Sequence, residues 1–262
     1  MTKSLTWLML AGIGLLSSNF AGAQSDSIIS GITQWKKLKV EKQDTRKTRQ
    51  VLDGPTVFME RFEIHATTLK AGMAPHPPHS HSDEEELIIV KEGQVQVTIG
   101  NESRILGPGS VAFAEIGDEH GFSNSGDTEA TYYVIKMKTR GAMDLERGQK
   151  AGGSFMIDYD EVAFNAHDRG GVRPYFRRST ALFDYFEMHV TTLNPGIQSH
   201  PPHTHAAAEI ILVIEGKVEE QIEDEFYKGK DGDLIFLASE SSHAIRNRGK
   251  KPARYFAFQW SE

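Results

Sequence analysis

Two short clusters of histidine and glutamate in this chain have the residue types and the spacing of a metal site. His79 and His81 are two positions apart, and so are His203 and His205. Residues two apart on a β-strand point to the same face, so each pair directs two imidazoles into one space. Each pair is therefore placed to hold a metal ion through two nitrogen ligands.

A glutamate and a third histidine follow each pair. Glu86 and Glu209 stand at the start of the next apolar stretch, and His120 and His243 come after a later glycine-containing turn. Three neutral imidazoles and one carboxylate suit a first-row divalent ion, and octahedral coordination would leave two positions for water or substrate. We therefore predict a divalent metal cofactor, which is manganese, iron, nickel or zinc. The predicted metal ligands are His79, His81, Glu86 and His120 in the first cluster, and His203, His205, Glu209 and His243 in the second.

The two clusters belong to an internal duplication. At an offset of 124 residues, FEIHATTL at 62–69 matches FEMHVTTL at 186–193, and HPPHSH at 76–81 matches HPPHTH at 200–205. Beyond the histidine pair the offset is 123, and ten of the 11 histidines have a matched partner, His167 being the exception. A single histidine is more often a core or solvated residue than a ligand. Two whole ligand sets in register make that reading improbable, and they indicate two related domains.

Short alternating strands must position these clusters. Residues 94–99 (QVQVTI) alternate polar and apolar types, residues 87–90 (LIIV) form a short apolar run, and glycines separate such stretches. Many short strands without a sustained helical period favour an all-β sandwich or barrel such as the jelly roll. We therefore predict two tandem jelly-roll β-barrels. The expected bounds are 45–140 and 168–262 for the barrels, 141–167 for a connector and 24–44 for an N-terminal arm.

The same residues carry a resemblance to a known family. An HxH pair, a glutamate after three or four further residues, a glycine after six more and a later HxxxN sequence resemble the two motifs of the cupin superfamily. Both copies have them, with Gly93 and Asn124 in the first and Gly216 and Asn247 in the second. The resemblance implies a two-domain (bicupin) fold and the metal ligands named above. The loops before the third histidine lack the proline that family members often have there, which concerns the pocket rim rather than the ligands.

A second pair of residues in each copy lies upstream of the histidine pair. Glu187 and His189 in the second copy, like Glu63 and His65 in the first, are two apart and so share one strand face. Glu187 and His189 are therefore candidate catalytic residues, acting as an acid or base beside the metal. The alternative is a structural pair within the strand.

Two further matched pairs are candidates for contact with a substrate. Arg49 and Arg173 match at the offset of 124, and a guanidinium can bind a carboxylate through two hydrogen bonds. Arg173 is therefore our third candidate catalytic residue, and an ordinary surface arginine is the alternative. His76 and His200, each followed by two prolines, line the mouth of a pocket or lie on a solvent-facing turn.

Composition and charge exclude several classes of function. Apolar residues make up 39% of the chain and charged residues 25%, as in ordinary globular proteins. The formal net charge of -7 argues against binding to nucleic acid or to an anionic membrane. Because the chain has no cysteine, it has no disulfide, no thiolate metal ligand and no cysteine nucleophile.

The cupin superfamily includes decarboxylases, dioxygenases, isomerases, aminohydrolases and binding proteins, so the resemblance alone does not choose a reaction. Because the metal sites have open positions, we favour an enzyme over a binding module. The leading hypothesis is that the metal holds a small anionic substrate such as a sugar acid for isomerisation, ring opening or elimination. Similar small cupins take part in the breakdown of uronate-containing polysaccharides. The alternatives are a metal-dependent dioxygenase or oxalate-type decarboxylase and a non-catalytic metal or sugar-acid binding module; a homo-oligomer is left open.

The first residues are typical of a secretory signal peptide. Lys3 precedes an apolar run over residues 5–16, and the small residues 21–23 (AGA) precede Gln24. The run is shorter than the roughly 18–20 apolar residues of a membrane span. We therefore expect residues 1–23 to be removed, leaving a periplasmic or secreted protein without a membrane anchor.

We predict that the mature protein begins at Gln24, because signal peptidase requires small residues at the positions that Ala21 and Ala23 occupy. N-terminal sequencing of protein purified from its own cells tests this. An intact Met1 in that material would contradict export.

Overall fold

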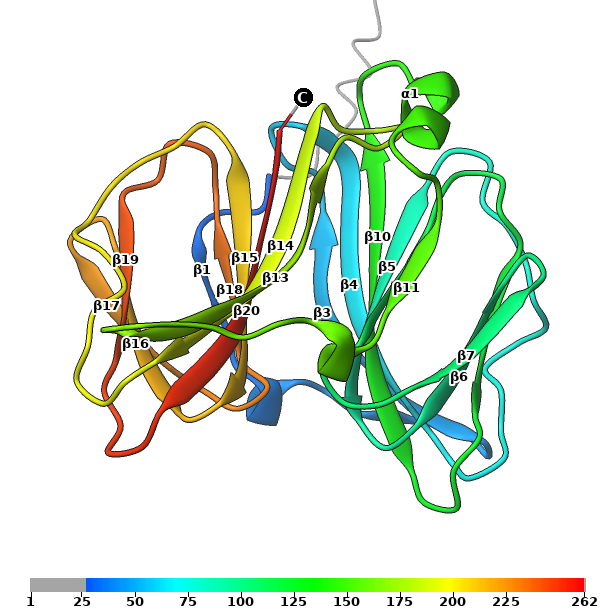
Figure 1. Cartoon of the computed structure of the whole chain (residues 1–262), viewed down its shortest axis with the longest axis horizontal. Helices are drawn as coiled ribbons and strands as arrows, with labels where there is room; N and C mark the ends of the chain where they lie inside the picture. Colours follow the sequence, from blue (N-terminus) through cyan, green and yellow to red (C-terminus); the bar gives the residue numbers. More distant parts are fainter. Residues whose placement is uncertain (1–26, 262) are drawn as a thin grey trace, which may run out of the picture.

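The computed structural model describes residues 27–261, which form two β-barrels side by side (Figure 1). Each barrel consists of a seven-stranded and a three-stranded antiparallel sheet. The all-β fold of two tandem jelly-roll barrels is confirmed. The expected signal peptide, residues 1–23, lies outside the described residues. Among residues 27–261, no helix is long and apolar enough to cross a membrane.

The N-terminal barrel has the sheet orders β11-β8-β5-β10-β4-β3-β2 and β7-β6-β9. Its strands are β2 (Glu41–Lys42), β3 (Arg46–Gly54), β4 (Met59–Leu69), β5 (Glu85–Glu92), β6 (Val95–Ile99), β7 (Glu102–Leu106), β8 (Val111–Ala114), β9 (His120–Asn124), β10 (Ala130–Thr139) and β11 (Phe155–Ile157).

The C-terminal barrel has the orders β1-β18-β15-β20-β14-β13-β12 and β17-β16-β19. Its strands are β1 (Gly31–Thr33), β12 (Asn165–His167), β13 (Gly170–Arg178), β14 (Tyr185–Leu193), β15 (Ala208–Glu215), β16 (Lys217–Ile222), β17 (Glu225–Lys230), β18 (Leu234–Leu237), β19 (His243–Asn247) and β20 (Ala253–Ser261). The described helices are short: η1 (Trp35–Lys37), α1 (Leu145–Lys150) and η2 (Tyr159–Glu161).

The two large sheets pack face to face and share one hydrophobic core. On β4, Phe62 and Ile64 belong to this core, as do Phe186 and Met188 on β14. The ring of Phe62 lies 4.9 Å from that of Trp260 on β20, centroid to centroid. Because side chains alternate along a strand, the intervening residues of the same strands point into the barrels instead. Each large sheet therefore joins the barrels with one face and lines a barrel with the other.

Residues 31–37 of the expected arm (24–44) and residues 155–161 of the expected connector (141–167) have matching structures. Strand β1 in the arm pairs with β18 of the C-terminal barrel, and β11 in the connector pairs with β8 of the N-terminal barrel. Helices η1 and η2 follow them at the same offset of 124 residues that relates the barrels. The strand preceding each barrel thus extends the sheet of the other barrel, which ties the two halves together.

A buried carboxyl group lies where the two barrels meet. Glu85 on β5 is fully buried, and it accepts hydrogen bonds from Thr180 Oγ1 at 2.8 Å and from the backbone N–H of Leu182 at 3.3 Å. The matching position in the C-terminal barrel is Ala208, also in the shared core. Burial raises the pKa of Glu85 from 4.5 to about 7, although these hydrogen bonds oppose the shift. Desolvation therefore outweighs them.

We predict that Glu85→Gln makes the protein more stable above neutral pH. As the pH rises from about 4.5 to about 7, the unfolded chain releases this proton before the folded chain does, so the folded state loses stability. The shift corresponds to ~3 kcal/mol. A neutral amide removes that loss, so the variant and the wild type should agree in free energy of unfolding near pH 4 and differ by up to ~3 kcal/mol near pH 8.

Urea unfolding of chelator-treated protein across this pH range measures the difference without a contribution from metal. Glu102→Gln, at an exposed position of β7, is the control and should leave the profile unchanged. Equal stabilities of Glu85→Gln and wild type at pH 8 would contradict the prediction.

Candidate metal centre

The N-terminal cluster brings four predicted ligands together. His79 and His120 face each other across a two-bond backbone bridge, while Glu86 lies near the start of β5. His79 Nε2 is 3.1 Å from His81 Nε2, which is 3.2 Å from Glu86 Oε2. One ligand atom from each of the four residues lies within 4.8 Å of the others. This is the spacing at which a single metal ion could contact all of them.

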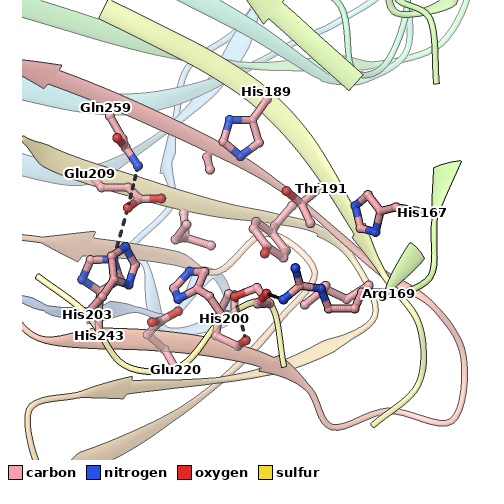
Figure 2. A pocket seen from close by; sticks show the side chains of 16 residues that line it. His167, Arg169, His189, Thr191, His200, His203, Glu209, Glu220, His243 and Gln259 are labelled. Atoms are coloured by element: carbon pink, nitrogen blue, oxygen red, sulfur yellow. Dashed lines mark hydrogen bonds and ion pairs between the residues drawn. The ribbon is translucent and has the colours of Figure 1, made fainter. Parts of the chain in front are cut away.

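The C-terminal cluster has the same plan, and Figure 2 shows His203, His243 and Glu209 in it. The ligand atoms of His203, His205 and His243 lie within 4.8 Å of one another. Glu209 Oε2 is 3.2 Å from His205 Nε2 and 3.4 Å from His243 Nε2. It also accepts a hydrogen bond of 3.1 Å from Gln259 Nε2. Glu209 therefore approaches two of the three imidazoles and is held from the opposite side by the amide.

The hydrogen bonds of the imidazoles favour metal binding. His120 Nδ1 lies 2.9 Å from the carbonyl oxygen of Asp118, and His243 Nδ1 lies 2.8 Å from that of Ser241. A carbonyl can only accept, so Nδ1 carries the proton and Nε2 keeps its lone pair. Within the described residues, the buried Nε2 atoms of His120 and His243 have no hydrogen-bond partner. Both atoms point toward the other ligands, so the residues fit a metal ion.

The electrostatics of the clusters agree with this chemistry. Burial, followed by the neighbouring histidines, lowers the pKa of His79 to about 4 and also lowers that of His203. Burial alone would raise the pKa of Glu209, but the nearby imidazoles of His205 and His243 lower it to about 2. The hydrogen bond with Glu209 has the opposite effect on His205, whose pKa it raises. Metal binding needs neutral imidazoles and an ionised carboxylate, and the lowered pKa values of His79, His203 and Glu209 favour those states.

Each cluster opens onto a cavity inside its barrel, of ≈ 270 Å³ in the C-terminal barrel and ≈ 210 Å³ in the N-terminal one. His189 on β14 lines the C-terminal cavity, and His65 lines the N-terminal one. His189 Nδ1 lies 3.2 Å from Glu187 Oε1, and this contact lowers the pKa of Glu187. The structure thus joins the two candidates as a Glu–His pair whose imidazole faces the cavity (Figure 2).

The third candidate catalytic residue lies elsewhere. The guanidinium of Arg173 lies over the ring of Tyr159 at 4.6 Å and donates a hydrogen bond to the carbonyl of Val162. Arg49 lies over Trp35 in the same way, at 4.5 Å. Neither arginine is among the described residues that line the metal cavities. Each one instead fixes the segment that precedes its barrel.

Two other arginines line the cavities. Arg46 lies in the N-terminal cavity and donates to the carbonyl of Pro75, and Arg169 lies in the C-terminal cavity and donates to that of Ser199. The carbonyls match at the offset of 124, but the arginines match at 123. A comparison of the copies that allowed a shift of one residue before the first strand would have found this pair.

Three more cavity residues with a charged or amide side chain have no equivalent of the same type in the other copy, so the repeat gave no signal for them. They are Lys136 in the N-terminal cavity, and Glu220 and Gln259 in the C-terminal one. Burial, and to a lesser extent the nearby charge of Glu209, raises the pKa of Glu220 well above its ordinary range. The backbone of Ala244 lowers this pKa by a smaller amount. His76 and His200, expected at a pocket mouth or on a turn, also line the cavities.

Comparison with known proteins identifies this architecture. The cupin domain model matches residues 66–136 and 189–258. The solved structure of protein Ylba from E. coli has 14% identity, covers 91% of this chain and 95% of its own, and has a TM-score of 0.71. Two oxalate decarboxylases each have a TM-score of 0.66. That of Lactobacillus farciminis has 13% identity and covers 89% of this chain and 87% of its own. That of Bacillus subtilis, a protein with Mn(II) centres, has 15% identity and covers 89% of this chain and 78% of its own. At these identities the likeness is one of fold. No curated protein sequence gives a significant match.

We predict that the protein reconstituted with manganese holds about two ions per chain, because both clusters offer imidazole nitrogens without other partners. His81→Ala with His120→Ala, and His205→Ala with His243→Ala, should each remove about one of the two ions. Elemental analysis after gel filtration measures the content, and circular dichroism checks the fold. Metal should also raise the melting temperature of the wild type. Protein that stays metal-free after separate reconstitution with manganese, iron, nickel and zinc would refute the site.

Proposed function

Because this chain belongs to the cupin family, with two tandem copies of the domain, we propose that it is a metal-dependent enzyme acting on a small oxygen-rich anion such as a sugar acid. The observation that carries this proposal is the Glu187–His189 pair, whose imidazole faces the same cavity as His203, Glu209 and His243. A base and a metal cluster that converge on one small cavity are typical of an active site.

The side chains of the C-terminal cavity suggest the roles. A divalent metal held by the four ligands would polarise an oxygen of the substrate. Arg169 is placed to bind a carboxylate. His189 Nε2 would take a proton from the substrate carbon next to the polarised group, while Glu187 holds the ring through Nδ1 and stabilises the charge that the ring gains. Returning the proton to a neighbouring atom gives isomerisation, and loss of a leaving group gives elimination or ring opening.

The place of this activity is also part of the proposal. The signal-like sequence of residues 1–23 supports export, and exported sugar-acid chemistry would serve the breakdown of uronate-containing polysaccharides near the cell surface. This assignment rests on the sequence of the first residues and on the family resemblance alone.

An oxalate-type decarboxylase is the second candidate. The structural likeness to two oxalate decarboxylases, one of them with Mn(II) centres, is compatible with it. A decarboxylase would consume oxalate and release carbon dioxide, and a related dioxygenase would consume oxygen. Isomerisation and elimination of a sugar acid neither release carbon dioxide nor consume oxygen. A binding module without catalysis would bind these anions with no turnover.

We predict that His189→Asn lowers kcat on uronate substrates by about 10²- to 10⁴-fold, the usual contribution of a general base. Glu187→Gln should lower it less, because the imidazole remains. Metal content should be unchanged in both variants, since neither residue belongs to the ligand cluster. Proton NMR of D-galacturonate, D-glucuronate and an unsaturated uronate, incubated with the manganese protein, measures turnover.

The matched control is His65→Asn, which removes the equivalent imidazole of the N-terminal cavity. The stretch from Arg173 to Arg178 is more cationic and aromatic than its N-terminal equivalent, but none of its residues lines the metal cavity. We assign turnover to the C-terminal barrel because its cavity, at ≈ 270 Å³ against ≈ 210 Å³, leaves more room for a sugar acid. His65→Asn should therefore retain most of the activity, and so should His81→Ala with His120→Ala, whereas His205→Ala with His243→Ala should abolish it. The opposite pattern in folded variants would move the active site to the other barrel.

A further inference from the structure

The two cavities are built almost alike, which makes their differences informative. Equivalent positions carry His65 and His189, Thr67 and Thr191, His76 and His200, and Tyr132 and Tyr255. Each cavity also holds one arginine, Arg46 or Arg169, that approaches a backbone carbonyl. Several lining positions differ, and two of these differences place a charged side chain beside the metal ligands.

The first difference is a carboxyl group in the C-terminal cavity. Glu220 lies opposite Ile245 in the pairing of β16 with β19, and Val97 lies opposite Phe122 in the equivalent pairing of β6 with β9. Glu220 is 0% exposed, and within the described residues neither carboxyl oxygen makes a hydrogen bond of normal geometry. A buried carboxyl without partners is costly. It lines the cavity together with His200 and Arg169 (Figure 2), so a ligand in the cavity is the natural partner.

The second difference is a cation in the N-terminal cavity. Lys136 on β10 pairs with Glu63 on one side and with Glu86 on the other, and Gln259 takes the same place between Glu187 and Glu209. Lys136 Nζ lies 3.5 Å from Glu84 Oε2, which does not line the cavity, and 3.8 Å from Glu86 Oε2, which does. The N-terminal cavity thus has a positive group at its metal cluster where the C-terminal cavity has a neutral amide.

The charges of the two cavities differ accordingly. The N-terminal cavity has two fixed cations, Arg46 and Lys136. The buried Nε of Arg46 has no hydrogen-bond partner within the described residues. The C-terminal cavity has one fixed cation, Arg169, and the additional carboxyl of Glu220. Two cations favour a ligand with two negative charges, whereas one cation with a carboxyl favours a single negative charge beside a hydroxyl.

We infer that Glu220 selects the ligand of the C-terminal barrel, which takes a hydroxyl-bearing monoanion, whereas the N-terminal barrel takes a dianion without that requirement. This inference rests on the proposed function in one respect, namely that both cavities bind anions beside a metal. It deepens that function, because it assigns a hydroxy acid to the barrel with the Glu187–His189 pair.

The test uses the full chain with one metal cluster disabled at a time. His81→Ala with His120→Ala leaves the C-terminal cluster, and His205→Ala with His243→Ala leaves the N-terminal cluster. Isothermal titration of each manganese-loaded protein with D-glycerate, a hydroxy monoanion, and with malonate, a dianion without a hydroxyl, gives two values of Kd. We expect the ratio of the malonate Kd to the glycerate Kd to be at least tenfold higher in the protein that keeps the C-terminal cluster.

Single substitutions then assign the difference to the named residues. In the protein that keeps the C-terminal cluster, Glu220→Val should weaken glycerate binding at least fivefold and leave malonate binding unchanged or tighter. Glu220→Gln retains hydrogen-bonding groups and should keep most of the glycerate affinity, which also controls for an effect on folding. In the protein that keeps the N-terminal cluster, Lys136→Gln should weaken malonate binding about tenfold. Metal content is measured for every variant.

Equal Kd ratios in the two proteins would overturn the inference, and so would an unchanged glycerate affinity in Glu220→Val. Failure of both cavities to bind either probe at millimolar concentration would also overturn it. These outcomes differ from failure of the proposed function. A protein that shows the expected ratios but no turnover of uronates would retain the selectivity assigned here and lose the enzymatic assignment.

Discussion

The structure depends on the alternation of side chains along the strands of the two large sheets. On β4, Phe62 and Ile64 enter the core shared by the barrels, while His65, the residue after Ile64, points into the N-terminal cavity. On β15, Ile210 enters the shared core and Glu209 reaches the metal cluster. A shift of one residue in register would exchange the two faces, placing imidazoles and carboxylates in the apolar core and aromatic rings in the cavity. The burial that joins the barrels therefore also fixes where the polar residues point.

The interior of each barrel contains buried polar groups that the described protein atoms do not satisfy. The Nε2 atoms of His120 and His243 and the carboxyl of Glu220 are all of this kind. Most buried polar atoms in proteins have partners, so such groups mark places where something else binds. In each barrel, the hydrogen bond from Nδ1 to a backbone carbonyl keeps Nε2 of His120 or His243 directed toward the other metal ligands. Stability is lost locally to build a site that a metal and an anion would complete.

The exchange of leading strands explains why the barrels act as one unit. Strand β1 extends the sheet of the C-terminal barrel although it precedes the N-terminal one, and β11 is placed in the reciprocal way. Arg49 and Arg173 match between the copies. Each lies over an aromatic ring, Trp35 or Tyr159, in the short helix that follows β1 or β11. Their pairing in the sequence thus reflects the junction between the barrels rather than the chemistry within them. A duplication preserves both kinds of position equally well.

The sequence by itself determined the duplication, the all-β fold and the grouping of the metal-site residues, because these follow from local rules. Residues two apart on a strand share a face, and the repeat makes each pattern appear twice. The pairing of Glu187 with His189 was open to two interpretations from sequence, and the structure places the imidazole in the cavity. Only the tertiary structure could bring Arg169, Glu220 and Gln259 beside the ligands, because each comes from a different strand or turn and two of them differ in type from their counterparts. Such neighbours are set by the pairing of strands that are distant in sequence, and neither residue spacing nor repetition records that pairing.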